Sequence, residues 1–505
     1  MNYILDINII LDYFNNTRRE KFPASIEAFN YCYKNSENIF LSSSSFDNIA
    51  FLKIKELKYE KGYSTKQSKK LVAEIIKFLL NRFKVASTPS YIDIDYEDIE
   101  DSQIIASANA INAKVITRDK GMLEKYSNKS IAPHEFLETR ESNIQNIDFA
   151  NLKKQYFLYQ SELEQEMDKV LNNSAYIMGE AIGELEKNLE EFTDASYAIT
   201  CGSGTDALLL AMMALDIKPD DEIITTPFTF IATAETIALM GAKPVFVDID
   251  EETYNIDPSK IEERISNKTK AIMPVSLYGQ PADMDAIQAI ADKHNLKVII
   301  DGAQSFGSTY NDIMDSNLGD ISTTSFFPAK PLGCFGDGGA VFTNDADLAE
   351  KIKSLRVHGQ SKRYHHKYIG MGGRMDTLQC AVVDVKLKYY SKDLALRQDV
   401  AKRYDEALKN NTLILPQVAE GRTSAYAQYS IRVQNRDEVQ SKLKEQGIPT
   451  AVHYPMPLHL QECFAYLGYS RGDFPISELI SNEIISLPMN PYLRDDEIEY
   501  IASYL

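Results

Sequence analysis

The sequence predicts an α/β protein in two regions, the second of which ends in a smaller α+β lobe. Short apolar runs alternate with amphipathic stretches of helical length, a pattern that favours mostly parallel sheets with helices on both faces. A polar, aperiodic segment at residues 138–147 is typical of a linker between the regions. We therefore expect domains at residues 1–137 and 148–394, and the small lobe at residues 395–505, where such runs become sparse.

Composition restricts the classes of protein to which the chain can belong. It has 505 residues, 44% apolar and 25% charged, with a formal net charge of -19. This acidic balance disfavours a protein devoted to wrapping nucleic acid or coating an anionic membrane. The N-terminus lacks the basic region of a signal peptide. The apolar stretch 207–215 is shorter than the roughly 18 residues that a membrane span needs. We expect a soluble cytoplasmic protein.

Cysteine spacing predicts neither a disulfide framework nor a zinc site, because the five cysteines are far apart and none forms a C-x-x-C pair. A reducing compartment is the simpler interpretation. The cysteines are Cys32, Cys201, Cys334, Cys380 and Cys463.

The first region begins with YILDINIILDYF, which predicts a strand and then a helix, and continues with NIFLSSSSF, a second strand and helix start. A long helical stretch and the segment DSQIIASANAINAKVITRD follow. Residues 53–84 hold nine lysines and one arginine against three glutamates. Such a run is either a solvated helix face or a surface that follows phosphates.

Four acids recur at element ends in this region: Asp6, Asp47, Asp101 and Asp119. Carboxylates gathered from strand ends can bind Mg²⁺ or Mn²⁺, and such ions activate water for phosphodiester cleavage. Taken singly, each acid is better explained as a helix cap or a solvated residue.

Together, LDxN at the first strand, the DxED segment and the ITRD segment resemble a PIN domain over residues 2–137. That resemblance implies a metal-dependent ribonuclease acting on single-stranded RNA. The second acidic position of the family is often Glu, whereas this chain has Asp47, which is one carbon shorter.

In the second region, five apolar runs predict the strands of a mostly parallel sheet. They are EIITTPFTF, KPVFVDID, AIMPVSLYG, KVIIDGA and ISTTSFF. The segment CGSGTDALLLA is a Gly/Ser/Thr turn that runs directly into an apolar helix. The backbone N–H groups of Gly204 and Thr205 would form an anion site at that helix N-terminus, although Ser and Thr also simply cap helices.

Lys330 follows an apolar run and is flanked by Gly and Pro, and Asp301 ends the earlier run KVII. Such a lysine can form a Schiff base with an aldehyde cofactor, whose protonated ring nitrogen an acid can hold. A buried carboxylate needs a cationic partner of this kind. Phe230 could stack on the ring, Gln304 could reach the ring hydroxyl, and Ser325 could bind a phosphate. Separately these residues are also explained as core, cap or surface residues; their ordered occurrence favours a cofactor site.

Residues 147–505 resemble the DegT/DnrJ/EryC1/StrS family of sugar-nucleotide aminotransferases, which use pyridoxal phosphate on a type I aminotransferase fold. The resemblance is carried by SGTDALLLA, PFTFIATAE, DGAQSFGS, SFFPAKPLGCFGDGGAVFT and GRMDTLQCAVV. DGAQSFG, SFFPAKPLG, YHH and RMDTLQ most resemble the branch that aminates the 3-keto group of UDP-linked N-acetylhexosaminuronic acids. The resemblance implies L-glutamate as amino donor, a homodimer with shared active sites, and a place in surface-polysaccharide or glycan biosynthesis.

The resemblance also implies a role for each site residue. Lys330 would form the internal aldimine and move the proton, Asp301 would pair with the pyridine nitrogen, and Gln304 would contact the ring's hydroxyl side. The phosphate would be held by Ser203, Gly204, Thr205 and Ser325, the ring stacked by Phe230, and the substrate contacted by Arg374, His453 and Tyr454.

Two features of this set stay open. Arg374 could equally hold a local carboxylate, and His453 and Tyr454 could belong to a structural loop. Gly372 stands where the family usually has an Asn for the neighbouring subunit's phosphate site.

These observations predict a fusion of an aminotransferase with a ribonuclease module. The alternative is a PIN-type RNA-binding or nuclease effector whose transferase part is a dimeric scaffold or metabolite sensor. In a third interpretation, the PIN-like part only supports assembly.

Overall fold

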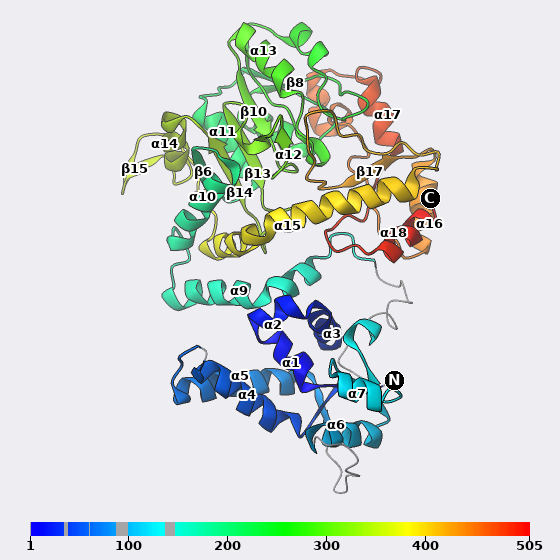
Figure 1. Ribbon diagram of the computed structural model, residues 1–505. Helices are drawn as coiled ribbons and strands as arrows, with labels where there is room; N and C mark the ends of the chain where they lie inside the picture. Colours follow the sequence, from blue (N-terminus) through cyan, green and yellow to red (C-terminus); the bar gives the residue numbers. More distant parts are fainter. Residues whose placement is uncertain (1, 35–38, 60, 87–98, 137–146) are drawn as a thin grey trace. The chain divides into compact units, whose positions relative to one another are not determined.

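The computed structural model describes residues 2–34, 39–59, 61–86, 99–136 and 147–505. The chain divides into two compact units, Met1–Ile144 and Gln145–Leu505, whose elements are labelled in Figure 1. No helix of the described ranges has both the length and the apolar character needed to cross a bilayer.

The N-terminal unit is built on a parallel five-stranded sheet with the order β3-β2-β1-β4-β5. Central strand β1 pairs with β2 and β4, and its residues Ile4 and Leu5 are fully buried. The elements are β1 (Asn2–Leu5), α1 (Ile7–Tyr13), α2 (Asn16–Lys21), α3 (Pro23–Lys34), β2 (Ile39–Ser42), α4 (Ser45–Tyr59), α5 (Thr65–Arg82), β3 (Lys84–Ala86), α6 (Ile99–Ala110), β4 (Ala113–Ile116), α7 (Lys120–Lys125) and β5 (Ser130–Ile131).

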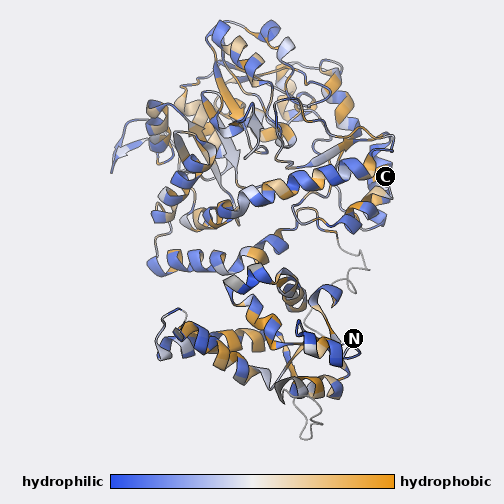
Figure 2. Ribbon diagram, viewed as in Figure 1, coloured by the Kyte–Doolittle hydropathy of each residue, from blue (hydrophilic) through white to orange (hydrophobic). Residues whose placement is uncertain are grey.

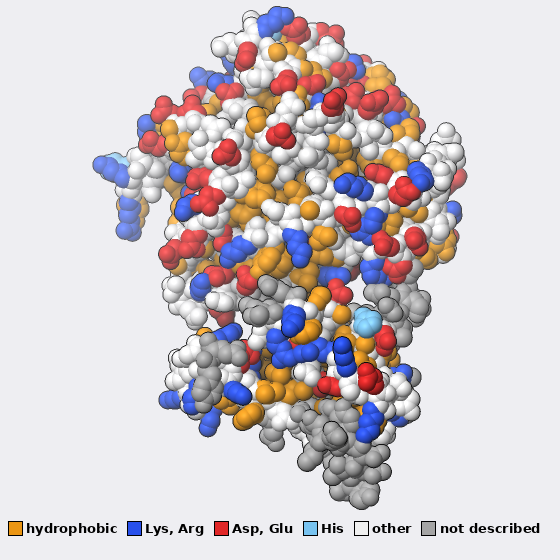
Figure 3. Space-filling model, viewed as in Figure 1, with side chains coloured by type: hydrophobic (Ala, Val, Ile, Leu, Met, Phe, Trp, Pro, Cys, Tyr) orange, Lys and Arg blue, Asp and Glu red, His pale blue; other side chains and the backbone are white. Residues whose placement is uncertain are grey.

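Helices α4 and α5 carry the lysine-rich segment. Apolar and polar residues alternate along both helices in Figure 2, as expected for helices that bury one face. Helix α5 begins at a capping box in which the side chains of Ser64 and Gln67 accept each other's backbone N–H groups. Lysine and arginine side chains are visible over this unit in Figure 3. Unlike the other lysines of these two helices, which are exposed, Lys53 is buried. It donates to Glu56 over 3.0 Å and to the Phe14 carbonyl.

The C-terminal unit contains a seven-stranded sheet with the order β6-β14-β13-β10-β9-β7-β8. Strand β14 is antiparallel to both of its neighbours, and the other pairs are parallel. The strands are β6 (Tyr197–Cys201), β7 (Glu222–Thr225), β8 (Lys243–Phe246), β9 (Thr269–Ile272), β10 (Lys297–Asp301), β13 (Ile321–Ser325) and β14 (Gly339–Thr343).

Helices cover both faces of this sheet because its strands are apolar on both sides. Ile299 of β10 packs in the cluster that includes α11 (Gly204–Ala214), whereas Val298 and Ile300 pack in the cluster that includes α13 (Met284–His294). The predicted α/β class is therefore confirmed for this unit. The other helices of the large lobe are α9 (Leu152–Asn173), α10 (Glu180–Thr193), α12 (Ile231–Leu239) and α14 (Ala346–Leu355).

Helix α15 (Thr377–Leu408), yellow in Figure 1, runs without a break through the expected lobe boundary at residue 394. The small lobe beyond it pairs β17 with β18 in antiparallel fashion. Its elements are β17 (Tyr429–Arg432), α16 (Arg436–Glu445), α17 (Pro475–Glu483), β18 (Ile484–Leu487) and α18 (Asp495–Ala502).

The two lobes meet through a backbone contact. Ala425 donates its N–H to the Gly279 carbonyl over 2.9 Å, and Ala427 donates to the Tyr278 carbonyl over 3.0 Å. Gly279 has a φ of +113°, and a Cβ at this position would lie 2.6 Å from the backbone nitrogen of Tyr426. Only glycine allows this backbone conformation and this close approach together.

Gly279→Ala should therefore destabilise the protein by on the order of 1–3 kcal/mol, because it adds a steric clash to a strained backbone. The measurement is the free energy of unfolding in urea. The matched control is Gly183→Ala, an exposed helical position with open space around it, which should stabilise the helix by roughly 0.5–1 kcal/mol. Equal effects of the two substitutions would contradict this account of the lobe contact.

Candidate active site

Residues at or just after the ends of five strands surround a cavity of about 500 Å³ in the C-terminal unit. Because parallel strands bring their carboxyl ends to one edge of a sheet, this is where an α/β protein usually places a ligand. Lining residues include Ser203, Gly204, Thr205, Phe230, Asp301, Gln304, Ser325, Lys330, His453 and Tyr454.

The N-terminus of α11 forms one end of the cavity. Ser203 caps this helix by accepting the Asp206 N–H over 3.0 Å. A Cβ at Gly204 would lie 2.7 Å from Cβ of Ser325, so only glycine fits between the helix and strand β13. The helix N-terminus and the Ser325 hydroxyl are thereby held together, a combination suited to a phosphate.

Asp301 ends β10 and is only 6% exposed. Its Oδ2 accepts the Thr233 hydroxyl over 2.7 Å, and its Oδ1 accepts the Ala303 N–H over 3.3 Å. Burial raises the pKa of the Asp301 carboxyl, and these two hydrogen bonds only partly oppose that effect. A buried carboxylate in this position is therefore poised to bind a cation.

Lys330 also lines the cavity, in a turn where its backbone N–H donates to the Phe327 carbonyl over 2.9 Å. Burial lowers the pKa of the Lys330 amine, and the Asp301 carboxylate partly opposes this. A lowered pKa favours the neutral, nucleophilic amine. No direct Asp301–Lys330 ion pair occurs among the described side chains, although both residues line the cavity.

Gln304 has protein partners on both sides of its amide. Its Oε1 accepts the Tyr278 N–H over 2.7 Å, and its Nε2 donates to the Tyr454 hydroxyl over 3.2 Å. The Tyr278 hydroxyl in turn donates to the His453 carbonyl. Gln304 therefore links the large lobe to the loop of His453 and Tyr454, a role that its motif did not predict.

His453 is joined to Tyr454 by a cis peptide bond, and its Nδ1 lies 2.9 Å from the Ser486 hydroxyl. Burial, followed by the nearby Lys330 charge, lowers the pKa of His453 to about 4, so the ring is neutral near pH 7. Phe230 is 54% exposed, with its ring centroid 6.1 Å from that of Tyr454. The Phe230 face is accessible for stacking.

Arg374 is not among the residues that line this cavity within one chain. A Cβ built on Gly372 would lie 3.8 Å from Nη2 of Arg374 and 3.1 Å from Cε1 of His358. Gly372 is thus overlaid by the His358 ring. The structure brings the other candidate residues of this unit together, but not Arg374.

The DegT/DnrJ/EryC1/StrS aminotransferase family model matches residues 158–505. The chain belongs to this family. A UDP-2-acetamido-2-deoxy-3-oxo-D-glucuronate aminotransferase from Pseudomonas aeruginosa is 48% identical over 359 residues, covering 71% of this chain and 99% of that protein.

Solved structures agree with the family assignment. A DegT DnrJ EryC1 StrS aminotransferase from Brucella abortus aligns with a TM-score of 0.68 and 40% identity, covering 71% of this chain and 98% of that one. NtdA from Bacillus subtilis with bound cofactor PMP aligns with a TM-score of 0.67 and 30% identity, covering 72% of this chain and 85% of that one.

Two buried residues of the aminotransferase unit were not found from the sequence. Thr233 holds Asp301 from α12, one turn after Phe230, and helical spacing was the only signal for it. Asp315 is 1% exposed and accepts the Ser305 hydroxyl, and a Cβ on Gly302 would lie 3.3 Å from its Oδ2. It therefore lies directly behind the Asp301 strand end.

The N-terminal unit lies outside the family match. Asp6 is buried at the end of β1, and its Oδ2 accepts the Thr117 hydroxyl over 2.6 Å. The same hydroxyl accepts the Asp119 N–H over 2.9 Å, and Asp119 caps α7 through the Met122 N–H. Asp6 and Asp119 thus meet at neighbouring strand ends. The side chains of Asp47, in α4, and Asp101, in α6, lie outside the described set.

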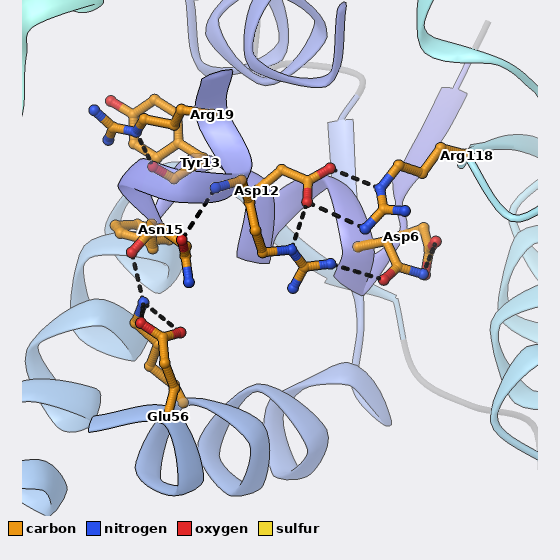
Figure 4. Close-up of polar contacts among 11 residues, drawn as sticks. Asp6, Asp12, Tyr13, Asn15, Arg19, Glu56 and Arg118 are labelled. Atoms are coloured by element: carbon orange, nitrogen blue, oxygen red, sulfur yellow. Dashed lines mark hydrogen bonds and ion pairs between the residues drawn. The ribbon is translucent and has the colours of Figure 1, made fainter. Parts of the chain in front are cut away.

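Among the described side chains, no three His, Cys, Asp or Glu residues gather closely enough to hold a metal. Asp12, an acid that the sequence analysis did not single out, is fully buried instead in an ion-pair cluster (Figure 4). Its carboxylate pairs with Nε of Arg18 at 3.0 Å and with Nε of Arg118 at 2.8 Å. This cluster ties α1 to α2 and to the end of β4.

The buried carboxyl group of Asp315 should make the stability of the protein depend on pH. Burial raises its pKa from 3.8 to about 6, so its stabilising contribution is complete below pH 3.8 and is lost as the pH rises through 6. A shift of this size corresponds to about 3 kcal/mol. The difference in unfolding free energy between Asp315→Asn and wild type should therefore shift in favour of the variant by up to about 3 kcal/mol as the pH rises from ~4 to ~8. The measurement is urea titration of the cofactor-free protein.

The control is Asp312→Asn, an exposed position in the same connection, which should follow the wild-type pH profile. If Asp315→Asn also follows that profile, Asp315 does not titrate in the folded protein as described.

Proposed function

We propose that residues 148–505 transfer an amino group to a nucleotide-linked ketosugar, with pyridoxal phosphate as cofactor and L-glutamate as donor. The observation that carries the proposal is that Lys330 and Asp301 line one cavity without a direct ion pair, together with the α11 N-terminus and Ser325. A cofactor with an aldehyde, a basic ring nitrogen and a phosphate matches these three features together.

The donor set fits pyridoxal phosphate. The phosphate would lie against Ser203, Gly204, Thr205 and Ser325, whose helix end supplies N–H groups and a favourable dipole. Asp301, which has no cation in direct contact, would pair with the ring nitrogen, and Thr233 would keep that carboxylate oriented. Phe230 would cover one face of the ring.

Bound pyridoxal phosphate supplies an electron sink that stabilises negative charge on the carbon next to the transferred nitrogen. Lys330 would do the proton chemistry at that carbon, because burial lowers the pKa of its amine and so makes the neutral, proton-accepting form more accessible. The neutral His453 ring and the Tyr454 hydroxyl, whose pKa burial raises, add no charge to the cavity. Asp301 therefore remains available to the ring nitrogen.

The substrate is best matched by a UDP-linked 3-keto-N-acetylhexosaminuronic acid, since a relative with 48% identity acts on UDP-2-acetamido-2-deoxy-3-oxo-D-glucuronate. Such a reaction would serve surface-polysaccharide or glycan biosynthesis. A uronate carboxylate requires a cation, and Lys330 and neutral His453 are the basic residues among those lining the described cavity. A homodimer in which Arg374 of a second copy faces the cavity would supply one.

The wild-type protein, incubated with pyridoxal phosphate, should show a visible absorption band, and Lys330→Ala should lack it because the Schiff-base nitrogen is gone. Mass spectrometry with UDP- and dTDP-ketosugars and glutamate should detect the amino sugar with wild type only. A colourless wild-type protein, or a Lys330→Ala variant that keeps the band, would contradict the proposal.

A second activity, metal-dependent RNA cleavage, is proposed for the N-terminal unit. It is favoured by the shared hydroxyl of Thr117, which brings Asp6 and Asp119 together at adjacent strand ends. The lysines of α4 and α5, most of them exposed, would attract a phosphate backbone. In the alternative, this unit is the effector and the transferase unit a dimeric scaffold or metabolite sensor.

Full-length protein should cleave single-stranded RNA with Mg²⁺ or Mn²⁺, and Asp6→Asn should reduce cleavage to the level seen with a chelator, because a metal ligand is lost. Lys330→Ala is the reciprocal control and should cleave like wild type. Equal cleavage by wild type and Asp6→Asn would contradict the proposed ribonuclease activity. The N-terminal unit would then be interpreted as a module that only supports assembly.

A further inference from the structure

Gln428 is brought to the cofactor cavity by the lobe contact. It directly follows Ala427, whose N–H donates to the Tyr278 carbonyl, and precedes Tyr429, which begins β17 and pairs with Leu487 of β18. Its backbone is thus fixed on both sides, and Gln428 lines the cavity that contains Lys330 and Asp301 as well as a smaller pocket beside Tyr254 and Tyr278.

The Gln428 amide has an unsatisfied acceptor. Its Oε1 is buried and accepts no hydrogen bond from any described residue. An unpaired buried acceptor is uncommon in folded proteins and is costly, because the group has lost its water partners. Such a group on a cavity wall is explained when a ligand supplies the missing donor.

Neighbouring polar groups of the protein do not supply that donor. Gln304 donates to Tyr454, and the Tyr278 hydroxyl donates to the His453 carbonyl. The His453 ring lies against the Ser486 hydroxyl through Nδ1. These hydrogen bonds are made among the wall residues themselves and leave the Gln428 oxygen without a donor.

The two substrates of an aminotransferase differ in what they offer to this oxygen. Once the amine of glutamate is engaged, its remaining polar groups are carboxylates, which accept hydrogen bonds and repel a carbonyl oxygen. A nucleotide sugar instead carries neutral O–H groups and, in an acetamido sugar, an N–H group. The unsatisfied acceptor therefore matches the sugar.

We propose that Gln428 is a specificity-determining residue that accepts a hydrogen bond from a neutral O–H or N–H group of the nucleotide sugar. This inference rests on the proposed aminotransferase function and deepens it, because it assigns Gln428 to the sugar half of the reaction. It predicts that a substitution at this position affects the half-reaction with the nucleotide sugar more than the half-reaction with glutamate.

The test uses Gln428→Met, which keeps the side-chain length and removes the acceptor. Gln428→Met should raise KM for the nucleotide sugar by about tenfold to a hundredfold, and leave the rate of the glutamate half-reaction, followed by visible absorption, within about twofold of wild type. Gln288→Met, on the surface of α13, is the matched control.

Paired sugars identify the donor group. If the acetamido N–H is bound, Gln428→Met should lose its penalty with a 2-deoxy sugar, which has no donor at that carbon; if a ring hydroxyl elsewhere is bound, the penalty should persist with both sugars. A KM unchanged in Gln428→Met, or an equal loss in both half-reactions, would overturn the inference.

A binding measurement separates this inference from the proposed function. Calorimetry of UDP-N-acetylglucosamine with the cofactor-free full-length protein needs no turnover. Weaker binding by Gln428→Met than by wild type would support the contact even if no ketosugar were aminated, and equal binding would overturn it. Absence of transfer by wild type counts against the proposed function alone.

Discussion

The buried carboxylate of Asp301 is the constraint on which the C-terminal unit depends. It stands at the carboxyl end of a fully covered strand, held by the Thr233 hydroxyl and one backbone N–H, with no cation in direct contact among the described residues. A charge placed this way is costly unless a cationic partner arrives. Lys330 lines the same cavity without a direct ion pair to Asp301, so the acid, the amine and the phosphate end are placed to bind one ligand between them.

The contact between the lobes is the second determinant of the site. Gly279 allows residues 425–427 to approach the large lobe closely enough for backbone hydrogen bonds. The same approach brings Gln428 to the cavity wall. In the proposed function, substrate recognition would therefore depend on how the lobes dock, whereas cofactor binding would depend mainly on strand ends of the large lobe.

The α/β class and the cofactor side of the site could be predicted from sequence because their signals are local. A turn that enters a helix at Gly204, an acid at the end of a buried strand and Lys330 after the next strand can each be recognised within a few residues. Thr233, Asp315 and Gln428 could not be predicted, since their roles arise from contacts between distant segments. Arg374 shows the converse: its motif marks it as a site residue, yet it does not line the cavity of its own chain.

The central claim is that Asp301 holds the ring nitrogen of the cofactor protonated. The most direct measurement is the ¹⁵N chemical shift of pyridoxal phosphate labelled at that nitrogen and bound to the protein. The account predicts a protonated nitrogen in wild type and an unprotonated one in Asp301→Asn, because the amide carries no charge to stabilise the pyridinium. An unprotonated nitrogen in wild type, or a shift unchanged by the substitution, would contradict it.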